Sequence, residues 1–297
     1  MNELASPAWP QIEAVFIERR TRPHGVQTAC AVALKAIGAD AGPELRAGLD
    51  DVAGFAAQIV ARPAYHDQYH FAEATMVMGW LCASARAAGL LDADSAACGV
   101  IAMAGHDLLH DGSVGTDGAL EARAAAAVDQ LLGAAGVDAR ARQRVGRIIL
   151  ATDPRQASGN AAALEVTPYD PDALLAVLAN EADLAASLMP TLGPRLGALL
   201  ATEWRNAGAA GAAAVETHAG RLAFLRNVAE LSRWGNAIGL ATARDTCFCA
   251  YAALGCTMAA GAARLDALSP AEAGIAYATA ISTVGGRHRP MSRAAVG

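Results

Sequence analysis

The sequence predicts an all-α protein. Apolar residues recur at helical spacing in nearly every segment of the 297-residue chain, and alternating apolar and polar runs bounded by hairpin turns are missing. Hydrophobic residues make up 54% of the chain and charged residues 18%, which is the balance of a globular protein and not of a disordered one. A chain of this length and composition can bury a sizeable helical core.

Helical periodicity divides the chain into a series of elements, and residues typical of helix ends mark several boundaries. Asp94 lies at the start of one helix, Pro171 begins another, and Gly133 and Gly136 close a third. The expected helices cover 11–19, 25–37, 43–60, 67–88, 93–105, 118–134, 138–151, 171–188, 193–208, 216–239, 243–265 and 270–283, with long loops at 110–118 and 153–170 and a flexible tail at 285–297.

Charge and cysteine usage exclude several classes of function. The formal net charge is -6, and no run of Lys and Arg supplies the basic surface that binding to a nucleic acid duplex requires. We therefore expect a small-molecule substrate. The six cysteines lack the paired spacing of a zinc or redox motif and are expected to be buried, reduced thiols.

The termini and the longest apolar stretch indicate a cytoplasmic protein that does not enter a membrane. The start, MNELASPAWPQIEAVF, has acidic residues where a signal peptide carries positive charge. The apolar stretch over 240–265 is interrupted by Arg244 and Asp245, which favours a core helix over a membrane span. Its small Ala and Gly residues allow close helix contact and are compatible with a homodimer.

Two histidines four residues apart form the first candidate motif. His66 and His70, in the segment Tyr65-His66-Asp67-Gln68-Tyr69-His70, share one face of a helix and can point into one cavity. An incidental surface or capping pair gives the same spacing, so this motif by itself leaves both interpretations open.

An adjacent His and Asp form the strongest local signal. His106 and Asp107 end a run of apolar residues, where both side chains are costly to desolvate unless they bind something. A divalent cation satisfies a neutral imidazole and a carboxylate together. Histidines near a helix C-terminus are also common for electrostatic reasons, but this does not explain why the pair is followed by His110-Asp111-Gly112.

Two further acidic positions lie on or at the end of apolar helices. Asp183 falls on or beside the apolar stripe of its helix, where an unpaired carboxylate is unfavourable and a ligand role would resolve the cost. A partly exposed acid beside Glu181 is the competing interpretation. Thr152 and Asp153 end another apolar helix and, taken alone, are a helix terminus.

The order of these motifs resembles the catalytic core of cyclic nucleotide phosphodiesterases, which belong to the HD superfamily of metal-dependent phosphohydrolases. The resemblance covers about residues 62–190 and runs through Tyr65-His66-Asp67-x-x-His70, His106-Asp107-x-x-His110, Leu120-Glu121, Leu150-Ala151-Thr152-Asp153 and Ala182-Asp183-Leu184. It implies a multi-helix bundle of that family's type. It also implies one domain over 1–284, with N-terminal helices in 1–61, a metal-binding core in 62–190, and C-terminal helices in 191–284 that close a pocket.

The resemblance implies a role for each of these residues. His70, His106, Asp107 and Asp183 would bind a first metal ion, Zn, Mn, Fe or Co, and Asp107 would bridge to a second, Mg or Mn. His110, Thr152 and Asp153 would hold waters of the second ion. His66 would be the general acid and Glu121 its hydrogen-bonding partner. A hydroxide shared by the ions would attack phosphorus while His66 protonates the departing alkoxide.

The chain departs from the family pattern at several positions. Asp67 replaces an Asn, and Ala122-Arg123-Ala124 replaces a pair of histidines after Glu121. Arg221, ahead of Phe224, stands where the family carries a purine-reading Gln, and both are candidate substrate-binding residues. A guanidinium only donates and prefers an anion, whereas an amide also accepts. The substrate is therefore left open between a cyclic nucleotide and another small phosphoester, including a phosphomonoester.

Two other functions compete with phosphodiester hydrolysis. Some HD-domain proteins resemble this chain in their ligands and use a di-iron pair to activate oxygen. A non-catalytic helical module that binds a nucleotide is the other alternative, although binding alone does not need a separate proton donor such as His66.

Overall fold

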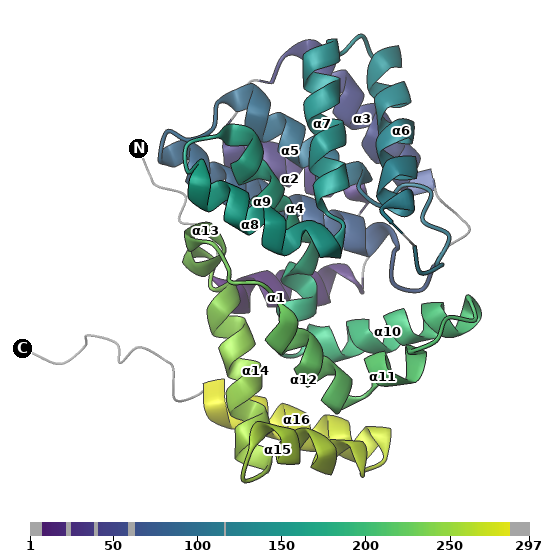
Figure 1. The fold of residues 1–297 in the computed structure, drawn as a ribbon, viewed down its shortest axis with the longest axis vertical. Helices are drawn as coiled ribbons and strands as arrows, with labels where there is room; N and C mark the ends of the chain where they lie inside the picture. Colours follow the sequence, from purple (N-terminus) through teal and green to yellow (C-terminus); the bar gives the residue numbers. More distant parts are fainter. Residues whose placement is uncertain (1–7, 22–24, 39–40, 59–62, 116, 286–297) are drawn as a thin grey trace, which may run out of the picture.

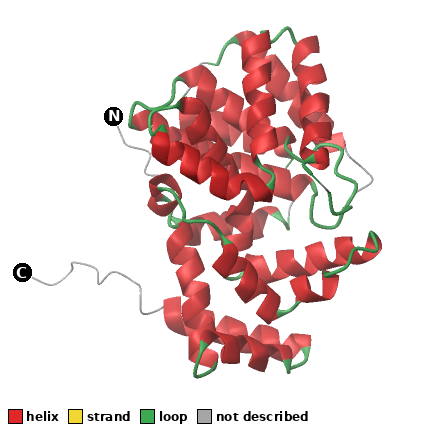
Figure 2. Ribbon diagram, viewed as in Figure 1, coloured by secondary structure: helices red, strands yellow, loops and turns green. Residues whose placement is uncertain are grey.

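The computed structural model of the chain describes residues 8–21, 25–38, 41–58, 63–115 and 117–285. Within these ranges the regular secondary structure is helical and no strand occurs, which confirms the predicted all-α class (Figure 2). The elements are α1 (Trp9–Arg19), α2 (Val26–Ile37), α3 (Pro43–Gln58), α4 (Gln68–Ala87), α5 (Ala93–Gly105), α6 (Ala119–Ala134), α7 (Ala139–Ala151), the 3-10 helix η1 (Pro154–Gln156), α8 (Ala157–Val166), α9 (Pro171–Leu188), α10 (Leu192–Asn206), α11 (Ala212–Glu216), α12 (His218–Asn227), α13 (Arg233–Ala237), α14 (Leu240–Leu254), α15 (Met258–Asp266) and α16 (Pro270–Gly285).

Helices α4 and α5 form the centre of the bundle. Helix α4 packs against α2, α5 and α9, and α5 is buried along its length from Ser95 to Gly105 (Figure 1). A helix that is apolar on every side is stable only when other helices surround it. The buried hydrophobic side chains form one cluster that runs from Ile12 to Ala280. The metal-ligand candidates on α4 and α9 and directly after α5 therefore project from the centre of the bundle.

A close approach of two backbones holds α4 in place. A Cβ atom added at Gly79 of α4 would lie 2.6 Å from both the Cα and the Cβ atoms of Ala33 in α2. Real Cβ atoms do not approach so closely, and the contacted atoms belong to backbone and to a side chain that cannot move aside. Gly79 thus allows α2 and α4 to pack at a distance that no other residue permits.

We expect Gly79→Ala to destabilise the protein by about 2 kcal/mol, because inserting a methyl group into a packed interface forces the two helices apart. Gly146→Ala is the matched control. Gly146 also lies inside a helix, α7, but a Cβ there meets nothing within 4 Å, so this change should stabilise by about 0.5–1 kcal/mol through helix propensity alone. Urea denaturation measures both. A Gly79→Ala protein as stable as the control would contradict the interpretation.

The predicted helices agree best with the structure as far as Leu188. N-terminal caps set several of these boundaries: the Asp67 side chain accepts from the backbone N–H groups of Tyr69 and His70, and Asp138 and Asp170 act in the same way for α7 and α9. The cap of α5 is Asp92, not Asp94, and its carboxylate accepts from the Ser95 N–H group. The predicted loop over 153–170 instead contains η1 and α8.

Two long C-terminal helices of the prediction are each broken into two. The segment 216–239 contains α12 and α13, because Ser232 caps α13 while its own N–H and hydroxyl groups donate to the Glu181 carboxylate on α9. The segment 243–265 contains α14 and α15, which meet at an angle of 74°. A Cβ at Gly261 would collide with the Tyr251 backbone, so that this glycine allows the sharp turn.

None of the helices in the described part of the chain is by itself both long enough and apolar enough to cross a membrane. The division of the chain into one domain over 1–284 stays a prediction. The predicted flexible tail over 285–297 lies, from residue 286 onward, outside the described residues.

Candidate metal centre

The first two candidate ligands are held by the ends of two central helices. His70 lies in the first turn of α4, where its backbone N–H group donates to the capping carboxylate of Asp67 at 3.0 Å. His106 directly follows α5, and its Nδ1 atom is 3.0 Å from the Met103 carbonyl oxygen. Because a carbonyl only accepts, Nδ1 carries the proton and the lone pair of Nε2 is left for a ligand.

Four predicted ligands converge in the structure. The Nε2 atom of His70 lies 3.1 Å from the Asp107 Oδ2 atom and 3.1 Å from the Asp183 Oδ1 atom. The Nε2 atom of His106 lies 3.1 Å and 3.4 Å from the same two oxygens, and 3.1 Å from the His70 Nε2 atom. These residues come from three helical segments that are far apart in the sequence, as the motif order predicted.

The spacing of the four atoms fits a metal ion. Ligands about 2.1 Å from a cation are about 3.0 Å apart at neighbouring corners of an octahedron and about 3.4 Å apart in a tetrahedron. The observed separations of 3.1–3.4 Å span this interval. Two imidazoles and two carboxylates are also the mixed donor set that Zn, Mn, Fe or Co accepts. The described residues thus contain a His/Asp group that could hold a metal ion.

The electrostatics of the group favour a bound cation. His70 and His106 are each 1% exposed. Burial lowers the pKa of His70, but the carboxylates of Asp107 and Asp183 outweigh it and raise this pKa to about 9. Burial raises the pKa of Asp183, whereas His106 and His70 act more strongly and hold it well below the ordinary value. Positive charge is therefore strongly stabilised at this point, and a divalent ion can supply it in place of protons on the two imidazoles.

A second cluster lies beside the first and was not foreseen in full. The Nδ1 atom of His66 is 2.5 Å from the Glu203 Oε1 atom, and the other oxygen of Glu203 accepts from the backbone N–H groups of Tyr65 and His66 at 2.9 and 3.1 Å. The His66 Nε2 atom is left facing the metal-ligand group, 3.9 Å from the Asp107 Oδ2 atom. His66 is thus fixed in one orientation by a carboxylate that is 2% exposed.

The hydrogen-bonding partner of His66 is a correction to the sequence-based prediction. Glu203 on α10, and not Glu121, receives the Nδ1 proton of His66. Glu121 lines the same pocket, where burial and the negative charges of Asp153 and Asp107 raise its pKa. The sequence around Glu203, Ala-Thr-Glu-Trp, has no feature that distinguishes it from other helical acids.

The three residues that were predicted to hold waters of a second metal ion, His110, Thr152 and Asp153, all line the pocket. They differ in the contacts that their side chains make. The His110 ring stacks on His66 with centroids 3.7 Å apart, and burial together with the charge of His66 lowers its pKa to about 4. The Thr152 hydroxyl donates to the Ile149 carbonyl oxygen at 2.7 Å. Asp153 is paired with Arg155 through contacts of 2.7–3.2 Å. Their role toward waters of a second ion stays a prediction.

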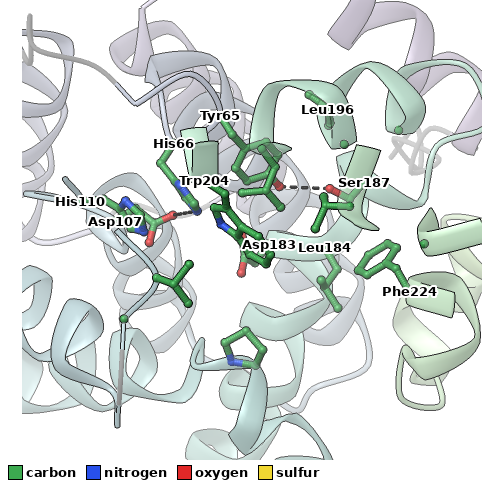
Figure 3. A pocket seen from close by; sticks show the side chains of 18 of the residues that line it. Tyr65, His66, Asp107, His110, Asp183, Leu184, Ser187, Leu196, Trp204 and Phe224 are labelled. Atoms are coloured by element: carbon green, nitrogen blue, oxygen red, sulfur yellow. Dashed lines mark hydrogen bonds and ion pairs between the residues drawn. The ribbon is translucent and has the colours of Figure 1, made fainter. Parts of the chain in front are cut away.

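A pocket of about 600 Å³ opens beside the metal-ligand group (Figure 3). Both predicted substrate-binding residues line it, but they differ in availability. Phe224 presents its ring to the pocket. Arg221 is buried, and its guanidinium donates to the carbonyl oxygens of Ser187 and Met189 at 3.0 Å each. The guanidinium therefore braces the end of α9 in the structure.

No protein-family model matches this sequence, and no curated protein matches it. The likeness to the HD superfamily accordingly remains a resemblance in motif order. What the structure adds to it is an all-helical fold, over the described residues, in which four of the His and Asp residues of those motifs, His70, His106, Asp107 and Asp183, meet at one point.

Proposed function

We propose that the protein is a metal-dependent phosphohydrolase of the HD type that cleaves a phosphodiester. The observation that carries this proposal is the pairing of two sites in one pocket. Two imidazoles and two carboxylates converge at cation spacing, and a separately anchored imidazole, that of His66, faces them. A protein that only binds a metal or a nucleotide has no use for this third imidazole, whereas hydrolysis of an ester with a poor leaving group needs a proton donor.

His70, His106, Asp107 and Asp183 would hold the first ion. Glu121 and Asp153 line the same pocket as Asp107 and add oxygen donors, which suit a second, harder ion such as Mg or Mn. When bound, divalent ions neutralise charge on the phosphoryl oxygens and lower the pKa of a water molecule so that it becomes a nucleophile near neutral pH.

The chain's own residues then handle the proton of the leaving group. Attack of water on phosphorus breaks the bond to the ester oxygen, and that oxygen takes the proton from the His66 Nε2 atom. Because Nδ1 stays bonded to Glu203, the ring cannot rotate away from the metal-ligand group, and Nε2 stays directed toward it. The neutral ring regains its proton from solvent after product release.

Metal content and a substrate screen test the proposal. We expect the purified protein to contain a transition metal, and we expect the metal-supplemented protein to hydrolyse bis-p-nitrophenyl phosphate faster than p-nitrophenyl phosphate. Removal of the ion with a chelator should abolish turnover, and addition of Zn or Mn should restore it. Activity that survives full metal removal would reject the proposal. Iron content together with oxygen consumption would instead support the di-iron oxygenase alternative.

A further inference from the structure

The pocket has an apolar half on the side of Asp183 away from His110. Leu184, next to Asp183 on α9, begins this wall, and Leu196 on α10 and Phe224 on α12 continue it (Figure 3). Pro194 and Leu200 of α10 also line the pocket. A substrate group bound here would be transferred from water to a surface of aliphatic and aromatic carbon atoms. Such a surface favours an apolar group.

Four polar side chains near this half, those of Ser187, Thr217, His218 and Glu216, are already hydrogen-bonded within the protein. The Ser187 hydroxyl pairs with the Tyr65 hydroxyl at 3.1 Å, and the Thr217 hydroxyl donates to the Ala214 carbonyl oxygen while accepting from the Gly220 N–H group. His218 pairs through Nδ1 with the Tyr251 hydroxyl at 3.1 Å. The Trp204 indole offers a donor but no acceptor.

A purine edge needs donors and acceptors together, and the described pocket lining contains no Asn or Gln side chain that would provide both. A base buried in this half would leave polar atoms without partners. The free-energy cost of a buried polar atom without a hydrogen-bond partner is large enough to disfavour such a ligand strongly.

Both arginines of the described pocket lining donate to oxygen atoms of the protein, and the Arg221 Nε atom, which has no such partner, is buried. Arg221 is committed to the Ser187 and Met189 carbonyl oxygens, and Arg155 to Asp153 and Asp117. Lysine is absent from the same lining. The carboxylates of Asp153 and Asp117 neutralise Arg155, and the Arg221 guanidinium is buried. The metal-ligand group is then the principal place where negative charge on the substrate is compensated, which favours a ligand with a single phosphoryl group.

We infer that the substrate is a phosphodiester monoanion with an uncharged alkyl or aryl arm, and that the apolar half of the pocket binds this arm. The inference rests on the proposed function, because it takes the phosphoryl group to lie at the metal-ligand group. On this inference the pocket binds an apolar ester in preference to a purine cyclic nucleotide.

A chain-length series tests the inference. Methyl n-alkyl phosphates, from dimethyl to methyl hexyl phosphate, are used as competitive inhibitors of bis-p-nitrophenyl phosphate hydrolysis by the metal-loaded protein. We expect the inhibition constant to fall by about twofold or more for each added methylene, up to about fourfold, which corresponds to about 0.8 kcal/mol per buried CH₂ group. Adenosine 3′,5′-cyclic monophosphate should inhibit more weakly than methyl hexyl phosphate. A flat series, or tighter binding of the cyclic nucleotide, would overturn the inference.

Two neighbouring leucines provide a matched pair of variants. Leu200 lines the pocket, whereas Leu199 on the same helix packs against the core outside it. Leu200→Ala should flatten the dependence on chain length, and Leu199→Ala should retain it. Equal slopes in the two variants would count against the apolar half as the binding surface.

The proposed function and the inference fail separately. If no metal-loaded form hydrolyses any phosphodiester, the proposed function is rejected, and the series is then measured as dissociation constants by calorimetry, where its slope still decides whether the apolar half binds the arm. If diesters are hydrolysed but the series is flat, the function stands and the apolar arm is rejected.

Discussion

Asp107→Ala is expected to abolish both metal retention and turnover. The Asp107 Oδ2 atom lies 3.1 Å from the Nε2 atoms of both His70 and His106, so its removal takes away a donor and one of the two carboxylates that attract a cation to this point. Metal content should fall from about one ion or more per chain to none, because a site with a missing ligand holds its ion too weakly to survive purification. Elemental analysis and hydrolysis of bis-p-nitrophenyl phosphate measure the two effects.

Asp111→Ala is the control for this change. Asp111 lies four residues further along the same segment, with a side chain that is 51% exposed and paired with Arg123. We expect this variant to keep its metal and its activity, since the carboxylate does not belong to the metal-ligand group. An Asp107→Ala protein that is folded by circular dichroism and retains metal would remove the basis for the assignment.

His66→Ala is expected to keep the metal and to slow the hydrolysis of esters with poor leaving groups by about 10²- to 10⁴-fold, the usual contribution of a positioned general acid. His66 touches the metal-ligand group only through its Nε2 atom, 3.9 Å from Asp107, so the ion should stay bound. Bis-p-nitrophenyl phosphate should be affected far less than diphenyl phosphate, because p-nitrophenolate leaves without needing a proton. The ratio of the two rates is the measurement.

His218→Ala is the matched control for the general acid. His218 lines the same pocket but is paired with Tyr251 and does not belong to either His cluster. Its removal should leave the ratio of the two rates unchanged, even if both rates fall. A His66→Ala protein that slows both esters equally, or that loses its metal, would show that His66 acts as a ligand and not as a proton donor.

The helices and site residues that the sequence predicted are each marked by residues in their own stretch of sequence. Asp67 and Asp138 are capping residues at the start of apolar periodic runs, and each begins a helix in the structure where the pattern placed one. His106 and Asp183 stand out because ionisable residues interrupt helices that are otherwise apolar, and such interruptions are costly unless something pairs with them.

The features that the sequence did not reveal depend on tertiary contacts. Glu203 is the single acid of α10, near the C-terminal end of an amphipathic helix, and the segment carrying Tyr65 and His66 docks on it and buries it. The break between α12 and α13 likewise depends on Ser232 meeting Glu181 of α9, a residue 51 positions away. Helix α8 lacks buried residues, so its Ala-rich sequence has no apolar stripe to recognise.

The metal-ligand group and the carboxylate that orients His66, that of Glu203, come from different parts of the chain. All four residues of the metal-ligand group lie at or before Asp183, whereas the carboxylate that orients the proton donor arrives on α10. If the proposed function holds, substitutions that shift only α10 should leave metal binding unchanged and alter which esters are cleaved fastest. Selectivity among leaving groups can therefore diverge between related chains whose cation sites are identical.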